Sequence, residues 1–303
     1  MILPSIVRLK HIDTTLNLRH QVLDMFSSCL AKISNKALKS YSISSSISNL
    51  VTTTRYGEAG SIFRIAMAST PVNSLGYELI TDLKAAFDEA GNDATCEGII
   101  LASDCRVFSA GLNMHELHTT DQDALDKFWG EFQELCYTIY GTKQAVIAEM
   151  AGHGPAAGTI LALCCDSRVA GPAITVGLNE AAFGLSVPTF VMTLMQDQIG
   201  IRQANRAMSI GTLFNSKEAL SIGLLDVVVD DAEEVREAAL KECQLWIAAP
   251  GRAGNKHWLK KKTLAMFRDE QQMDKDAFIE CVTLPLTQKR LGAYLASLKS
   301  KKK

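Results

Sequence analysis

The sequence lacks several features that would assign it to a specialised class of protein. A membrane-spanning helix needs roughly 20 apolar residues in a row, and polar or charged residues interrupt every apolar run here well before that length. The formal net charge is only −2, which indicates neither a nucleic acid nor an anionic membrane as a partner. The eight Cys include no C-x-x-C pair, so neither a zinc ribbon nor a disulfide framework is expected. The composition, 47% hydrophobic over 303 residues, is that of a globular protein with a sizeable core.

The N-terminal segment differs in composition from the rest. Residues 1–54 carry six Lys or Arg against two acids, are rich in Ser and Thr, and begin with a basic amphipathic pattern. These traits are typical of a mitochondrial transit peptide. We therefore expect residues 1–50 to lie outside the fold and to direct the protein to the mitochondrial matrix. The alternative is an N-terminal extension that carries no targeting signal.

Strand-like and helix-like segments alternate over residues 55–188, which predicts an α/β layered domain. Residues 189–303 are mainly helical in pattern, which suggests a capping or oligomer-forming region. The expected strands are 61–67, 98–102, 145–150, 167–170, 173–176 and 227–229, and the expected helices are 76–90, 124–140, 159–165, 189–199, 201–211, 216–222, 233–248, 253–268, 273–282 and 284–298.

A turn of small residues, Gly152–Gly158, joins an expected strand to an expected helix. Unpaired N–H groups at such a helix start favour negative charge. The turn fits G-x-G-x-x-G/A, but it lies in mid-chain, contains a Pro, and no acidic residue ends a second strand about 20 residues later, as a dinucleotide site requires. It also lacks the Gly-Lys-Ser/Thr ending of a P-loop. A resident phosphate is therefore not favoured.

A second turn of the same kind, FSAGLN at Phe108–Asn113, also leads from a strand into a helical stretch. Two turns with exposed N–H groups could converge on one oxygen and form an oxyanion hole, in which one donor contributes roughly 3 to 4 kcal/mol. Each turn alone is also compatible with a purely structural role. A third segment, 177–185, places Glu180 among apolar and small residues, where burial would raise its pKa and suit it to remove a proton from carbon. An exposed Glu180 would not do so.

The segments FSAGLN, GHGPAAGTILALCCD and VGLNEAAFGLSVP, in this order and spacing, resemble the crotonase (enoyl-CoA hydratase/isomerase) superfamily. The signature Gly-Leu-Asn-Glu at Gly177–Glu180 is most similar to that of its mitochondrial Δ3,Δ2-enoyl-CoA isomerase branch. The resemblance extends from about Ser61 to the C-terminus. It implies a spiral of ββα units, a C-terminal helical oligomerisation region, a homotrimer and an acyl-CoA substrate, with CoA as part of the substrate and no metal or redox cofactor.

The resemblance also implies roles for individual residues. The N–H groups of Leu112 and Ala157 correspond to the two oxyanion donors, although the family commonly has Gly where Ala157 stands. Glu180 corresponds to the catalytic acid of the later loop. The expected substrate-binding residues are Ala110, Gly111, Leu112, Asn113, Met114, Ala157 and Asn179.

One departure from the family's hydratases bears on the reaction. Those enzymes use two acids, and the position of the first is Ile160 here, so only Glu180 remains. Adding water needs two groups, whereas one base can remove a proton from C2 and return it at C4. We therefore expect an isomerase of 3-enoyl-CoA in fatty-acid β-oxidation. A hydratase, an acyl-CoA hydrolase and a catalytically silent acyl-CoA-binding relative remain the alternatives.

Two further groups of residues are weaker candidates. His115 and His118 are three apart, but without a third ligand they do not define a metal site. Lys256, Lys260, Lys261 and Lys262 are typical of a solvated helix face, and in this family could also meet the phosphates of CoA. Asp166 is expected to cap a helix or form a structural pair rather than take part in chemistry.

Overall fold

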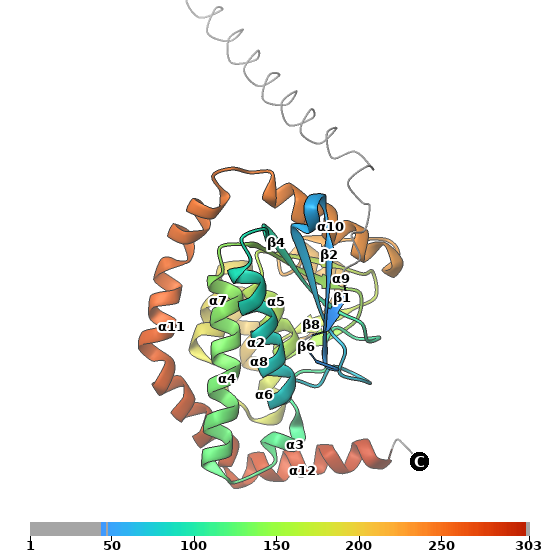
Figure 1. Cartoon of the computed structure of the whole chain (residues 1–303). Coiled ribbons are helices and arrows are strands. Elements are labelled where there is room, and N and C mark those ends of the chain that lie inside the picture. The colour runs from blue at the N-terminus through green and yellow to red at the C-terminus, as the bar shows by residue number, and fades with distance from the viewer. Residues whose placement is uncertain (1–43, 47, 301–303) are drawn as a thin grey trace, which may run out of the picture. The chain divides into compact units, whose positions relative to one another are not determined.

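The computed structural model describes residues 44–46 and 48–300 (Figure 1). The expected transit peptide therefore lies almost wholly outside the described residues. Within them, no helix has both the length and the apolar character needed to cross a membrane.

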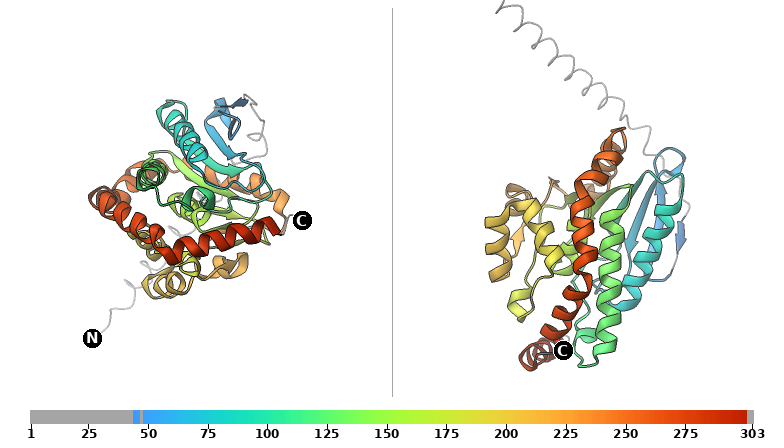
Figure 2. Two further views of the ribbon diagram at one scale, coloured as in Figure 1. Left: turned by 90° about the horizontal axis from the view of Figure 1, so that it is seen from below. Right: turned by 90° about the vertical axis from the view of Figure 1, so that its left-hand side faces the viewer.

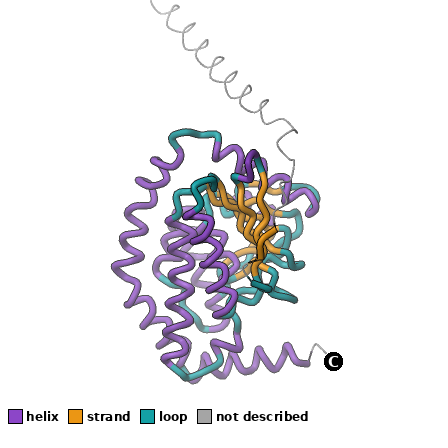
Figure 3. The backbone as a smooth tube through the Cα atoms, in the orientation of Figure 1, coloured by secondary structure: helices purple, strands orange, loops and turns teal. Residues whose placement is uncertain are grey.

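A seven-stranded sheet forms the centre of the described chain (Figure 3). Its strand order is β1-β2-β3-β4-β5-β7-β10; β1 to β3 pair antiparallel, and β3 to β10 pair parallel. All residues of β3 and β5 are buried, as expected for parallel strands covered on both faces. The strands are β1 (Ser44–Ser46), β2 (Val51–Tyr56), β3 (Ile62–Met67), β4 (Gly98–Ser103), β5 (Ala145–Met150), β7 (Ser167–Ala170) and β10 (Val227–Val228).

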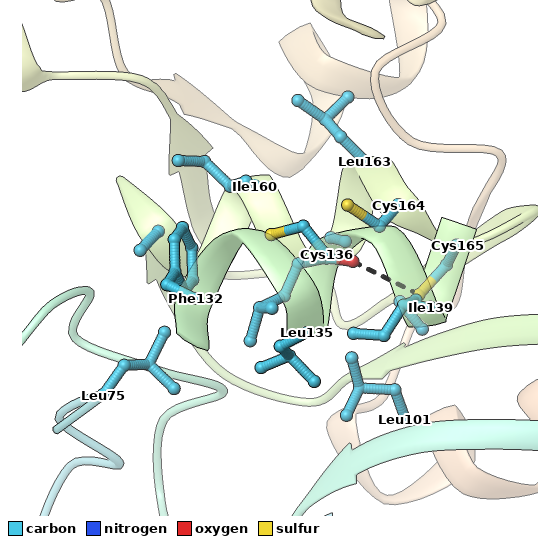
Figure 4. Close-up of a cluster of buried hydrophobic side chains, with 14 of the residues drawn as sticks. Leu75, Leu101, Phe132, Leu135, Cys136, Ile139, Ile160, Leu163, Cys164 and Cys165 are labelled. Carbon is cyan, nitrogen blue, oxygen red and sulfur yellow. Dashed lines mark hydrogen bonds between the residues drawn. The ribbon is translucent and has the colours of Figure 1, made fainter. Parts of the chain in front are cut away.

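Helices cover this sheet and bring their apolar faces to the core. The helix α2 (Tyr77–Asn92) packs against β2, β3 and α4 (Gln122–Gly141), and α10 (Val235–Ile247) packs against β4, β5 and β7. The core continues between α4 and α5 (Ala157–Cys164), where Figure 4 shows apolar side chains and the buried thiols of Cys136, Cys164 and Cys165 together. The remaining helices of the middle of the chain are α3 (Met114–Leu117), α6 (Glu180–Phe183), α7 (Thr189–Ile199), α8 (Ile201–Ile210) and α9 (Ser216–Ser221), with short 3-10 turns at Glu58–Gly60 and Ala232–Glu234.

A small second sheet brings together segments that are distant in sequence. In this sheet β6 (Gly154–Pro155) pairs parallel with β8 (Thr175–Gly177), and β8 pairs antiparallel with β9 (Phe214–Asn215). Strand β6 is part of the turn before α5, and β8 ends three residues before Glu180. This sheet therefore fixes the two segments relative to each other.

The C-terminal region contains one long helix where the sequence pattern predicted two. Helix α11 (Arg252–Thr283) runs unbroken through residues 269–272, Asp-Glu-Gln-Gln, and packs along α4 and α7 before α12 (Pro285–Ser300) begins (Figures 1 and 2). The prediction of separate helices at 253–268 and 273–282 was wrong. It took a gap in the apolar pattern as a break, although the gap contains neither Gly nor Pro and its residues are compatible with a helix.

The layered core also extends beyond the 55–188 range expected for it. Strand β2 starts at Val51, and its run Val-Thr-Thr-Thr is rich in β-branched residues that favour strands. Strand β10, beyond Pro188, pairs with β7 in the main sheet. The α/β architecture is as expected, but its boundaries are wider than the composition of the chain indicated.

Candidate active site

The first element of the site is the turn that leads into α5. Ala156 has φ 51° and ψ −125°, a conformation that costs a non-glycine residue on the order of 1 to 3 kcal/mol. The hydrogen bond from its N–H to the carbonyl of Gly177, 2.8 Å long, holds it in place. Ala157 is the first residue of the helix, so its own N–H has no partner within the helix.

The second element is the turn at 108–113. The carbonyl of His153 accepts hydrogen bonds from the N–H groups of Phe108 (2.9 Å) and Ser109 (3.2 Å), which ties this turn to the first. Gly111 has φ 90°, a conformation that favours glycine. On either side of Leu112, the carbonyl of Gly111 and the N–H of Asn113 bond to Leu75, 2.9 Å each. The N–H of Leu112 lies between these two hydrogen-bonded groups and has no acceptor of its own among the described residues.

The two turns meet where the family resemblance placed the oxyanion donors. A Cβ built on Gly111 would lie 3.2 Å from the Cβ of Ala156 and 3.6 Å from the N of Ala157. In the described part of the chain, neither the Leu112 nor the Ala157 amide donates a hydrogen bond to a protein acceptor. Two adjacent, unused N–H groups are the arrangement that an oxyanion hole requires.

Glu180 is the first residue of α6 and lies three residues after Gly177, the last residue of β8, whose φ is 135°. Its Oε2 atom is buried and has no hydrogen-bond partner among the described residues. Burial raises the pKa of the Glu180 carboxyl to about 7, and a hydrogen bond from its own backbone N–H offsets only part of this rise. A carboxylate with this pKa can both accept and release a proton near neutral pH.

The C-terminal helices hold the short helix that carries Glu180. The Sγ of Cys281 donates to the carbonyl of Gly184, the left-handed residue that ends α6, over 3.3 Å. The rings of Phe183 and Tyr294 pack edge to face with centroids 5.3 Å apart. Because α12 contacts both α3 and α6, it connects the segment after the turn at 108–113 to the segment that carries Glu180.

The other expected substrate-binding residues have different surroundings. The Asn113 side chain caps α3: its Oδ1 accepts from the N–H of His115 (3.0 Å), and its Nδ2 donates to Glu116 (3.1 Å). Ala110 is exposed and Met114 is half-buried beside the turn. Asn179 precedes α6, and no hydrogen bond joins its side chain to Glu180 among the described residues.

Glu116 is a residue of this region that the sequence analysis missed. Its Oε2 accepts from the N–H of Tyr77 at the start of α2 (2.9 Å), and its Oε1 accepts from Asn113. It thus joins the segment after the turn at 108–113 to the start of α2. The spacing Asn113-x-x-Glu116, typical of helix N-termini, is the signal that could have identified it.

Two of the four lysines form ion pairs inside the protein rather than lie on a solvated face. Lys256 and Lys260 bind the two carboxylate oxygens of buried Asp166, each over 2.6 Å. Burial alone would raise the pKa of Asp166, but the two ammonium groups hold it below its ordinary value. Asp166 therefore forms a structural ion pair, as expected, and it holds the N-terminal part of α11 against the core. No group of His, Cys, Asp and Glu within the described ranges could hold a metal, so the His115 and His118 pair remains without further ligands.

Ile160 lies in an apolar environment. It is 2% exposed and belongs to the buried cluster formed by α4, α5 and their neighbours (Figure 4). An ionised carboxylate in its place would have to be stabilised against the loss of hydration. A buried apolar side chain therefore occupies the position that the resemblance assigns to the first acid of the hydratases.

Comparisons with known proteins identify the family to which the chain belongs. The sequence model of the enoyl-CoA hydratase/isomerase family matches residues 57–289. The mouse protein "Enoyl-CoA delta isomerase 1, mitochondrial" is 34% identical over 251 residues, which cover 81% of this chain and 86% of the mouse protein. Its human counterpart is 34% identical over 237 residues, 77% of this chain and 78% of the human one. A probable enoyl-CoA hydratase of Mycobacterium tuberculosis is more distant, with 26% identity over 205 residues, 68% of this chain and 78% of that protein.

The solved structures similar to this chain have the same fold. The crystal structure of human mitochondrial Δ3-Δ2-enoyl-CoA isomerase matches with a TM-score of 0.79 and 32% identity, over 83% of this chain and 99% of that one. An enoyl-CoA hydratase from Bacillus halodurans matches with a TM-score of 0.73 at 22% identity, over 80% of this chain and 99% of that one, which supports the fold alone. The chain has the crotonase fold and belongs to the enoyl-CoA hydratase/isomerase family.

Proposed function

We propose that this protein is a Δ3,Δ2-enoyl-CoA isomerase that converts cis- or trans-3-enoyl-CoA to trans-2-enoyl-CoA in fatty-acid β-oxidation. One observation carries the proposal: Glu180, whose buried Oε2 atom is unpaired, begins α6 three residues after the end of β8, and β8 pairs with the turn that contributes Ala157. The relatives named as isomerases, at 34% identity, support the same reaction.

The proposed reaction uses three groups: the N–H of Leu112, the N–H of Ala157 and the carboxylate of Glu180. The thioester oxygen of the substrate accepts hydrogen bonds from the N–H groups of Leu112 and Ala157, and these strengthen as the oxygen gains negative charge. Glu180 removes a proton from C2, and an enolate forms. Protonated Glu180 then delivers the proton to C4, so that the double bond moves to C2–C3 and Glu180 returns to its ionised state. Because its pKa is about 7, the Glu180 carboxylate is a stronger base than an ordinary glutamate and is still partly ionised at neutral pH, and the two oxyanion donors lower the cost of forming the enolate.

Hydration of a 2-enoyl-CoA is the second candidate, because hydratases occur among the relatives. Ile160 speaks against it, since an apolar side chain can neither activate water nor deliver its proton. The carboxylate of Glu116 does not replace the missing acid, since both of its oxygens already accept hydrogen bonds from Tyr77 and Asn113. Hydrolysis of the thioester would likewise need an activated water or a nucleophile. The intact base and turns speak against a silent acyl-CoA-binding protein.

We expect the purified protein to convert 3-hexenoyl-CoA to trans-2-hexenoyl-CoA, because one base and two oxyanion donors suffice for this reaction. The product is identified by chromatography and mass spectrometry against standards. A parallel incubation with trans-2-hexenoyl-CoA measures hydration. Formation of 3-hydroxyhexanoyl-CoA faster than isomerisation would make the protein a hydratase, and release of free CoA would make it a hydrolase.

Location and assembly complete the proposal. We place the protein in the mitochondrial matrix, on the basis of the basic, Ser-rich leader and the mitochondrial relatives. A fluorescent reporter fused to residues 1–54 should enter mitochondria, and a diffuse signal would contradict this location.

We also propose a homotrimer, supported by exposed apolar side chains on and after α8, among them Ile201, Ile210 and Leu213. Light scattering that gives the mass of a single chain would contradict the trimer.

A further inference from the structure

The hydroxyl of Thr159 joins two segments of the candidate site that are distant in sequence. Its Oγ1 donates to the carbonyl of Gly154 over 2.6 Å and accepts from the N–H of Gly177 over 2.7 Å. The Thr159 side chain is buried, and its hydroxyl makes both hydrogen bonds inside the protein. Thr159 is the one side chain among residues 48–300 whose hydrogen bonds connect the turn before α5 to the strand before Glu180.

The two glycines that Thr159 joins, Gly154 and Gly177, each lie three residues before a residue that the proposed reaction uses, Ala157 and Glu180. Gly154 precedes Ala156, whose strained backbone sets the direction of the Ala157 N–H. Gly177 lies three residues before Glu180 and has φ 135°. The carbonyl of Gly177 accepts from Ala156 (2.8 Å) in the turn while its N–H donates to Thr159 in α5, so both of its polar backbone groups are bound to the start of α5.

The relevant separation is that between an oxyanion donor and the base. The carbonyl carbon and C2 of a thioester are directly bonded, so the hydrogen-bond donor and the carboxylate must stand at a fixed distance for both to act at once. The strands β6 and β8 that set this distance are only two and three residues long. Strands this short provide few backbone hydrogen bonds, which leaves the Thr159 hydroxyl as a major connection between them.

We propose that Thr159 is a positioning residue that holds the Ala157 N–H and the Glu180 carboxylate at the separation the isomerisation requires. This inference rests on the proposed function. Thr159 touches neither substrate nor proton in this role, and acts through Gly154 and Gly177. Its loss should therefore reduce the rate of the chemical step more than the affinity for the CoA ester.

The test compares Thr159→Val, which keeps the shape and removes the hydroxyl, with Thr159→Ser, which keeps the hydroxyl. We expect Thr159→Val to lower kcat for 3-hexenoyl-CoA by about 10- to 100-fold with KM within about threefold, the effect of a small misplacement of reacting groups. Thr159→Ser should retain most of the wild-type kcat. Circular dichroism and thermal unfolding establish that each variant is folded.

Ser216 provides a matched control. It is also a buried hydroxyl that donates to a carbonyl, Gly171 (2.8 Å), and accepts from an N–H, Ile174 (3.0 Å), but neither partner carries a group of the reaction. Ser216→Ala should lower the melting temperature and leave kcat near the wild-type value. An equal loss of kcat in Ser216→Ala and Thr159→Val would reduce the role of Thr159 to general stability and overturn the proposal.

Hydrogen–deuterium exchange separates this inference from the proposed function. In Thr159→Val, but not in Thr159→Ser, peptides covering residues 152–160 and 174–182 should exchange faster, whether or not the wild-type protein is an isomerase. Unchanged exchange in Thr159→Val overturns the positioning role. A wild-type protein without isomerase activity, combined with faster exchange in Thr159→Val, leaves the connection in place and refutes the proposed reaction instead. An active wild type with an unimpaired Thr159→Val variant refutes the positioning role alone.

Discussion

Glu180→Gln is expected to lower kcat for 3-hexenoyl-CoA by about 10²- to 10⁴-fold, the range that a positioned acid–base group contributes. Glutamine has nearly the same shape but cannot accept a proton from carbon at neutral pH. The steady-state rate of 2-hexenoyl-CoA formation measures the loss. Binding of a saturated CoA ester, measured by calorimetry, should change little because the amide fills the same space.

The same variant has an expected effect on stability that excludes misfolding as the cause. The folded-state pKa of Glu180, about 7, lies above the ordinary value of 4.5, so ionisation opposes folding. The contribution of Glu180 to stability therefore falls as the pH rises from below 4.5 through 7, by an amount on the order of 3 kcal/mol at most. Glu180→Gln removes this cost and should unfold at a higher temperature than wild type at pH 8. A variant that is inactive and less stable at pH 8 would contradict the assigned environment of Glu180.

Gly111→Ala is expected to lower kcat by about 10²- to 10³-fold, the loss that follows removal of one oxyanion donor. The added methyl group would lie 3.2 Å from the Cβ of Ala156 and 3.6 Å from the N of Ala157, in the space between the two turns. The Leu112 and Ala157 N–H groups would then be pushed apart or screened from the thioester oxygen. Initial rates with 3-hexenoyl-CoA measure the effect.

Gly200 provides the matched control for this substitution. It also has a positive φ, 79° against 90° for Gly111, but a Cβ built on it meets no atom within 4 Å. Gly200→Ala therefore introduces a similar backbone strain without a contact at the site. It should lower the melting temperature and preserve kcat. If both variants lost activity equally, the effect would come from strain, and the assignment of the two turns as an oxyanion hole would lose its support.

Much of the layered core could be predicted because its strands carry strong local signals. The runs at β3, β4 and β5 are mainly apolar, interrupted by the buried pair Arg64 and Glu149, and each forms a strand as predicted. Two elements with weaker local signals, strand β2 and the middle of α11, were predicted wrongly. Strand β2 is rich in Thr and followed a Ser-rich leader, so composition assigned it to the leader rather than to the sheet. Residues 269–272 lack apolar side chains, and at this point α11 meets α4 through polar contacts, in which Gln271 forms hydrogen bonds with Gln133 and Glu134.

The candidate site was less accessible from sequence than the fold. The position of Glu180 was indicated by its apolar neighbours, but its unpaired Oε2 depends on the surroundings built by β8, α6 and α12. The pairing of Lys256 and Lys260 with Asp166 joins residues about 90 positions apart, which no local pattern records. The double role of the Thr159 hydroxyl likewise depends on the pairing of β6 with β8.

The pH dependence of kcat/KM for wild-type protein with 3-hexenoyl-CoA tests the central claim, a single buried carboxylate as the base. Because Glu180 must be ionised to remove the C2 proton, kcat/KM should fall as the pH decreases through about 7, with one ionisation on the acid side. The same profile should be absent from the residual activity of Glu180→Gln. An acid limb near the ordinary glutamate pKa of 4.5, or one that persists in Glu180→Gln, would contradict the account.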